Sequence, residues 1–225
     1  MGLWSNLKSL FAAEPEVCPT PQPQPQPQPQ PEPEVPVQVV GDDPKPTVVL
    51  PERITDPFHV YRPMFDLIGH TEGTDKGDGY NETLAYGKLT GGDVNLVGMT
   101  LRDIDKLQTA MLRHPANKWN SSAIGRYQII RTTLRGLKPT LKLSDDMLYG
   151  ENMQDMLCLQ LLKRRGIQGW LAGSRSTNSF LNQLALEWAS LPKPDGKGAY
   201  KGQGGQHSVA LVHAALTEVR KRAEG

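Results

Sequence analysis

Residues 66–75, which read D-L-I-G-H-T-E-G-T-D, are the stretch of the chain best suited to chemistry. Tyr61, Phe65 and Ile68 recur at the spacing of one helical face, and four residues further along the same face comes Glu72. A glycine follows directly, so we expect the helix to end there. A carboxyl group at the core-facing end of a helix is partly removed from water, which raises its pKa and suits it to general acid catalysis near neutral pH. The alternative interpretation is a glutamate at a solvated helix end.

Two further carboxylates, Asp75 and Asp78, follow Glu72 closely in the sequence. One of them would be the second carboxylate of a glycosidase, since ordinary glycosidases use a pair. The other interpretation, which we favour, is that both are turn residues of a loop rich in glycine.

Apolar periodicity elsewhere predicts a mainly α fold of the α+β class with a single small β element. We expect further helices at about 100–113, 128–137, 144–165, 176–190 and 205–223. Residues 73–98 are rich in Gly, Asn, Asp and Thr, which predicts a loop with a short irregular hairpin. Because this loop follows Glu72 directly, we expect the hairpin to lie beside the substrate cleft.

The N-terminal quarter of the chain has a different character from the rest. Residues 1–13 place Leu3, Trp4, Leu7, Leu10 and Phe11 on one helical face, which predicts a short amphipathic anchor, against the alternative of a frayed terminus. Residues 14–57 hold 14 of the 19 prolines, including a strict Pro-Gln alternation, and predict a disordered, extended linker. A folded catalytic domain would then occupy residues 58–225.

Charge and length narrow the function classes. The chain has 225 residues, which suits one or two domains. Residues 1–50 carry 2 basic and 6 acidic residues, whereas the remainder carries 23 basic and 18 acidic residues, a net charge of +5. This mildly basic body suits an anionic polymer but lacks the basic stripe of a nucleic-acid-binding protein. No apolar run of about 18 residues is present, so the sequence predicts no membrane-spanning helix.

Three segments together resemble a known family. They are H-T-E-G-T-D at 70–75, S-S-A-I-G-R-Y-Q at 121–128 and L-E-W-A-S-L-P at 186–192. In this order they resemble the lambda-type phage endolysins, which are peptidoglycan lytic transglycosylases of the lysozyme superfamily. The resemblance covers roughly residues 58–223 and implies a lysozyme-like domain. The preceding anchor and linker resemble the layout of the virion-associated lytic protein of enveloped double-stranded RNA phages, the cystoviruses.

The resemblance implies roles for individual residues. Glu72 would be the catalytic acid and base that cleaves the bond between N-acetylmuramic acid and N-acetylglucosamine with a 1,6-anhydro product. The middle motif would line the sugar cleft through Ser122, Tyr127 and Gln128, of which Tyr127 would stack on a sugar and Gln128 would bond an N-acetyl group. Tyr200, in the loop after the third motif, is a further cleft candidate.

Two charged residues near these motifs have open roles. Arg126 would pair with a carboxylate of the peptide stem, or it is a solvated arginine. Glu187 departs from the family pattern, in which this position is apolar, and we interpret it as a structural ion pair.

Rival functions remain at this level. A zinc-dependent endopeptidase or amidase would need metal ligands, but the lone H-x-E at 70–72 does not match H-E-x-x-H, and the two cysteines form no metal pattern. We therefore expect no metal and no cofactor. A muramidase that hydrolyses the same bond is a second rival, and a non-enzymatic tether between virion layers is a third.

The expected partner is peptidoglycan, not nucleic acid, with peripheral contact of residues 1–13 to a membrane or virion layer. The expected location is the virion, between envelope and inner shell, and the periplasm of the infected host.

Overall fold

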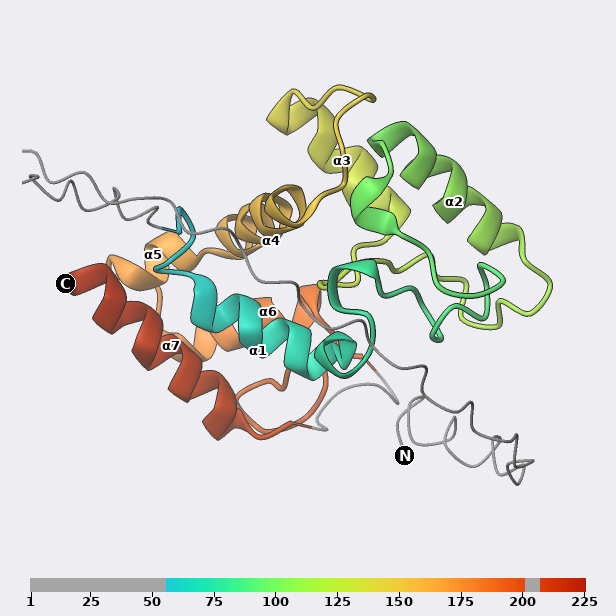
Figure 1. Ribbon diagram of the computed structural model, residues 1–225. Helices are drawn as coiled ribbons and strands as arrows, with labels where there is room; N and C mark the ends of the chain where they lie inside the picture. Colours follow the sequence, from blue (N-terminus) through green and yellow to red (C-terminus); the bar gives the residue numbers. More distant parts are fainter. Residues whose placement is uncertain (1–55, 201–206) are drawn as a thin grey trace, which may run out of the picture.

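The computed structural model describes residues 56–200 and 207–225, and within them the chain is mainly helical, as predicted (Figure 1). The anchor expected at 1–13 and nearly all of the linker lie outside the described residues. None of the helices in the described part is long and apolar enough to cross a membrane. The α-helices are α1 (Arg62–Glu72), α2 (Leu101–Arg113), α3 (Arg131–Leu141), α4 (Glu151–Arg165), α5 (Ile167–Leu171), α6 (Thr177–Glu187) and α7 (Val209–Glu224).

The helices form two groups. In Figure 1, α1, α5, α6 and α7 lie together on one side, α2 and α3 lie on the other, and α4 runs between the groups. Helix α1 packs along α7, and α4 packs against α5 and α6. One apolar core runs through both groups, from Met64 in α1 to Val219 in α7.

Helix α1 matches the predicted pattern and positions the glutamate. A proline in the first turn starts it, where the missing N–H costs nothing. Met64, Phe65 and Ile68 are fully buried, so the predicted apolar face is the packed face. Gly73 ends the helix with a φ of 78°, a left-handed conformation that glycine adopts without steric strain. The last helical residue is therefore Glu72.

The prediction of a hairpin within residues 73–98 is wrong. The described residues of this region form 3₁₀ turns at Thr74–Lys76, Gly79–Asn81 and Leu96–Gly98, and the pairing consists of isolated bridges, Thr83 with Ile124 and Ile124 with Ile129. The β element thus lies between this loop and the middle motif. Positive φ angles at Ala85 and Tyr86 break the extended conformation that a hairpin strand needs.

Helices α3, α4 and α7 begin several residues later than the sequence predicted, and α7 begins at Val209 and not at about residue 205. Helix α4 begins at Glu151 because the preceding loop pairs with the start of α2: the carbonyls of Met147 and Asp145 accept from the N–H groups of Leu101 and Arg102 at 2.8 and 3.0 Å. These N–H groups have no partner within α2, so the loop stabilises that helix end. Helix α3 begins at residue 131 because residues 124–129 form a tight turn.

Candidate active site

Glu72 lies at the C-terminal end of α1, where its side chain is half-buried. Burial raises the pKa of this carboxyl from 4.5 to about 7, and a hydrogen bond from Ser190 opposes part of that rise. A carboxyl with a pKa near 7 is substantially protonated at neutral pH and can both donate and accept a proton there. Glu72 thus lies at the helix end and is partly buried, as its spacing predicted, whereas its catalytic role stays a prediction.

Ser190 is the direct partner of this carboxyl. Its Oγ donates to Glu72 Oε1 at 2.6 Å and lies 3.2 Å from Thr71 Oγ1. Ser190 belongs to the W-A-S-L-P turn that follows α6, and the sequence pattern predicted no role for this serine. The two residues are 118 positions apart, so no local spacing could have paired them.

The three sequence motifs meet around Glu72 through hydrogen bonds to backbone groups. Thr74 of the first motif donates its hydroxyl to the carbonyl of Arg126 at 2.8 Å. Trp188 of the third motif donates its indole N–H to the carbonyl of Tyr127 at 3.3 Å. Together with the Ser190–Glu72 bond, these contacts tie each motif to both of the others. The three motifs are therefore in contact with one another at the end of α1.

Arg126 is an internal ion-pair partner, which corrects both interpretations made from the sequence. Its Nε donates to Asp75 Oδ1 at 2.9 Å, and its Nη2 donates to Asp66 Oδ1 at 3.0 Å. Its guanidinium also lies over the ring of Tyr80, 5.4 Å from the centroid. The side chain is 13% exposed, so it is neither solvated nor open to a peptide stem in this structure. It fixes the loop after Glu72 to the middle motif.

Ser122 and Tyr127 are placed in the core, which speaks against the sugar contacts expected for them. Ser122 is 2% exposed, and its Oγ accepts from the N–H of Arg131 at the start of α3. Tyr127 is 1% exposed, and its hydroxyl donates to buried Asp155 at 2.5 Å. Their polar groups are used internally, because a tyrosine or serine without a hydrogen-bond partner would be costly at such depth.

Gln128 and Tyr200 are more accessible. Gln128 is half-buried with a φ of 49°, and its amide donates to the carbonyl of Gly125 at 3.0 Å. Tyr200 is 48% exposed, and its hydroxyl donates to the carbonyl of Leu186 at the end of α6. Both remain predicted sugar contacts.

Glu187 forms the ion pair that the sequence suggested. Its side chain is 8% exposed and accepts from Arg164 at 2.8 Å and from Arg165 at 2.6 Å. Because both arginines belong to α4, the cluster fixes the end of α6 just before the turn that carries Ser190.

A histidine pair lies next to the site. The rings of His70 and His207 are 5.7 Å apart between centroids, and burial, followed by the charge of His70, lowers the pKa of His207. Within residues 56–200 and 207–225, no group of three or more His, Cys, Asp or Glu side chains is placed to hold a metal ion.

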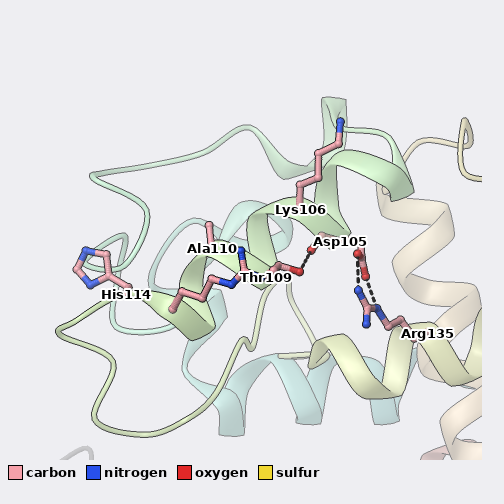
Figure 2. A pocket seen from close by; sticks show the side chains of 7 residues that line it. Asp105, Lys106, Thr109, Ala110, His114 and Arg135 are labelled. Atoms are coloured by element: carbon pink, nitrogen blue, oxygen red, sulfur yellow. Dashed lines mark hydrogen bonds and ion pairs between the residues drawn. The ribbon is translucent and has the colours of Figure 1, made fainter.

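A shallow pocket between α2 and α3 is separate from this site. It is lined by Asp105, Lys106, Thr109, Ala110, Arg113, His114 and Arg135, none of which belongs to the three motifs. Figure 2 shows Arg135 reaching across from α3 to Asp105, which binds it through two hydrogen bonds of 2.6 and 2.7 Å. Because the pocket shares no residue with the three motifs, the candidate site is the region around Glu72, where the motifs meet.

The mainly helical fold places the half-buried carboxyl of Glu72 at the end of α1, in contact with the turn that follows α6. A family profile described as Endolysin matches residues 62–219, and the chain therefore belongs to the endolysin family. This confirms the resemblance to phage endolysins, and as a member of that family the protein is a peptidoglycan-degrading lytic enzyme.

Solved structures of the lysozyme from bacteriophage lambda are similar. One, in complex with a chitohexasaccharide, is 23% identical and covers 74% of this chain and 95% of its own, with a TM-score of 0.45. A second is 20% identical with the same coverages and a TM-score of 0.43. No curated protein sequence matches the chain significantly.

Proposed function

We propose that this endolysin is a lytic transglycosylase that cleaves the β-1,4 bond between N-acetylmuramic acid and N-acetylglucosamine with Glu72 as its only catalytic carboxyl. The observation that carries the proposal is the half-buried position of Glu72 and its pKa of about 7. Such a group can serve as acid in one step and base in the next without a second ionisable partner.

The reaction proceeds in two proton transfers at one carboxyl. Protonated Glu72 donates its proton to the glycosidic oxygen, and the bond to the anomeric carbon breaks. The resulting carboxylate then takes a proton from the 6-hydroxyl of the muramoyl residue, whose oxygen attacks the anomeric carbon and closes the 1,6-anhydro ring. Glu72 ends protonated, so no water is consumed. Ser190 holds the carboxylate between the two steps, since its hydroxyl donates to Oε1.

The surroundings of Glu72 support one catalytic carboxylate more than two. Asp75 is held by Arg126, and Glu82 is 7% exposed and accepts from the N–H groups of Asp78 and Thr83 at 3.0 Å each. A hydrolytic muramidase would need one of these groups free to activate water or attack the sugar. Asp78 is exposed and is the remaining candidate for that alternative.

The N-terminal quarter would deliver the domain to its substrate. Residues 1–13 are proposed as a peripheral anchor on a membrane or a virion layer, and residues 14–57 as an extended spacer. This arrangement suits an enzyme carried in a virion, between envelope and inner shell, that acts on the wall in the periplasm. Removing residues 1–13 should abolish association with phage particles or lipid vesicles. Equal partitioning of both proteins would contradict the anchor.

Substitution of Glu72 tests the catalytic role. Glu72→Gln should reduce the clearing of purified sacculi at least about 100-fold, because general acid catalysis alone contributes about 10²- to 10⁴-fold. The matched control is Glu151→Gln, which makes the same change at an exposed position in the first turn of α4 and should leave activity unchanged. Activity of Glu72→Gln within about tenfold of the parent would contradict the proposal.

A further inference from the structure

We propose that Tyr86 forms a sugar-binding subsite beside Glu72, where its ring packs against the apolar face of an N-acetylhexosamine of the glycan strand. The proposal rests on the glycan-cleaving function above and adds to it a residue that the sequence pattern had placed in a hairpin.

The ring of Tyr86 lies along the loop that follows the catalytic glutamate. Its hydroxyl oxygen is 3.8 Å from the point that a Cβ on Gly73 would occupy, and its Cε1 is 3.6 Å from the corresponding point on Gly77. Gly73 directly follows Glu72 in the chain. Both distances are ordinary van der Waals separations, so the aromatic ring lies beside the backbone of this loop. A sugar in contact with the ring would therefore be next to the scissile bond.

The turn that carries Tyr86 is anchored at its base. The N–H of Tyr86 donates to the carbonyl of Thr83 at 3.0 Å, and the N–H of Gly87 donates to the Thr83 hydroxyl at 3.1 Å. The N–H of Leu84 donates to the carbonyl of Ala123, which joins the turn to the middle motif. The turn that carries the ring is thus joined to the middle motif, to which Thr74 also joins the loop after Glu72.

Tyr86 is exposed to solvent, unlike the residues on either side of it. Its neighbours Ala85 and Gly87 are both buried, whereas Tyr86 is 54% exposed. Ala85 and Tyr86 also have φ angles of 60° and 53°, a left-handed conformation that is unfavourable for residues other than glycine. Backbone strain of this kind clusters at binding and catalytic sites, where the surrounding structure maintains it. A strained turn that presents a tyrosine to solvent beside the catalytic group fits a ligand contact.

The chemistry of the side chain indicates the class of ligand. One face of a pyranose presents C–H groups, whereas its hydroxyl groups point outward around the ring. Tyrosine offers a flat apolar surface with a polar tip and loses little conformational entropy when it is immobilised, because it has few rotatable bonds. An aromatic side chain therefore selects a sugar ring over a peptide carboxylate or a phosphate.

Binding without cleavage tests the subsite. The full-length protein carrying Glu72→Gln would be titrated with hexa-N-acetylchitohexaose by calorimetry, because this soluble oligomer has the β-1,4-linked N-acetylglucosamine backbone. Tyr86→Asn should then weaken binding at least about tenfold, since asparagine tolerates the left-handed conformation but lacks the ring. Tyr86→Phe, which keeps the ring, should bind within about threefold of the parent. Lys88→Asn, an exposed control on the same loop, should change nothing.

The outcomes separate this proposal from the one on which it rests. If the Glu72→Gln protein binds the oligomer and Tyr86→Asn binds it equally well, the subsite is overturned and the glycan-cleaving function stands. If the Glu72→Gln protein does not bind at all, the proposed function is contradicted and the subsite with it. Should Tyr86→Asn unfold, nuclear magnetic resonance of the ring protons of Tyr86 in the Glu72→Gln protein decides, because stacking must shift them on sugar addition. Unshifted ring signals in a saturated complex overturn the subsite.

Discussion

Ser190 Oγ lies 2.6 Å from Glu72 Oε1, so a turn near the end of the chain supplies the hydrogen bond to a carboxyl at the end of the first helix. The bond has two consequences. It holds the Glu72 carboxyl in one orientation. It also stabilises the ionised carboxylate, which lowers the pKa, whereas burial raises the pKa. The balance of these opposing effects leaves the pKa of Glu72 near 7.

Removing this hydrogen bond should change the pH dependence of catalysis. Because the free enzyme must carry a protonated Glu72, kcat/KM of the parent should fall as pH rises through about 7. Ser190→Ala removes a donor to the carboxylate, so the pKa rises and the fall should move about one pH unit higher. The pH at which kcat/KM falls is measured for the parent and for Ser190→Ala from the turnover of a soluble glycan across pH 4–10. If kcat/KM fell at the same pH in both proteins, Ser190 would have no influence on the pKa of Glu72, and this prediction would be wrong.

The raised pKa of Glu72 should also affect stability. The pKa is about 7 in the folded protein against 4.5 for the ordinary group, so the folded state binds the proton more tightly. The associated stability is therefore fully present below pH 4.5 and is lost as pH rises through 7. Glu72→Gln cannot ionise, so above pH 7 it should be more stable than the parent, by at most about 3 kcal/mol. Denaturant unfolding at pH 4 and pH 8 gives the free energy of unfolding of Glu72→Gln and of the parent. If the difference between the two proteins does not grow with pH, the burial of the carboxyl is contradicted.

If Glu72 is the only catalytic carboxyl, Asp75 should not be needed for catalysis. Asp75→Asn keeps an oxygen that accepts from Arg126, so the loop should remain in place with a loss of about 0.5–1.5 kcal/mol. Catalysis should stay within about tenfold of the parent, because Asp75 takes no part in the proton transfers. A loss of about 1,000-fold in kcat without unfolding would instead identify Asp75 as the second carboxylate of a hydrolase.

Tyr127 should contribute to stability and not to sugar binding. Tyr127→Phe removes a hydroxyl that donates to Asp155, whose carboxylate is 2% exposed and also accepts from Arg62 and Tyr80. Losing one partner of a buried charged group should cost about 1–3 kcal/mol. The KM for glycan should remain unchanged. A raised KM with unaltered stability would restore the sugar contact expected from the sequence.

The sequence located the parts of the site that depend on local patterns. Periodicity along α1 placed Glu72 at the end of the buried face, and the glycine after it marked the helix end. It could not place Ser190, because the bond to Glu72 joins residues 118 positions apart. Tyr127 shows a different limit: a tyrosine in a polar motif suits a sugar cleft and a hydrogen-bonded core equally well, and only the position of Asp155 decides between them.

The same distinction applies to the fold. Stripes of apolar residues predicted every long helix, and α2 and α6 begin within one residue of the predicted position, whereas the start of α4 is set by a tertiary contact. The loop before α4 is extended because its carbonyls bond the N-terminus of α2, a pairing with no signal in either segment alone. The expected hairpin failed for a related reason, since the bridge partner of Thr83 is Ile124 in the middle motif and not a neighbouring strand.

The products released from purified peptidoglycan test the central claim most directly. Mass spectrometry of muropeptides after digestion by the full-length protein should show 1,6-anhydromuramic ends, lighter than the hydrated sugar by one water because none is added in the reaction proposed for Glu72. These ends should be missing after digestion with Glu72→Gln. Reducing muramic ends would contradict the account in favour of a hydrolase, and new free amino groups with intact glycan strands would contradict it in favour of a peptidase or amidase.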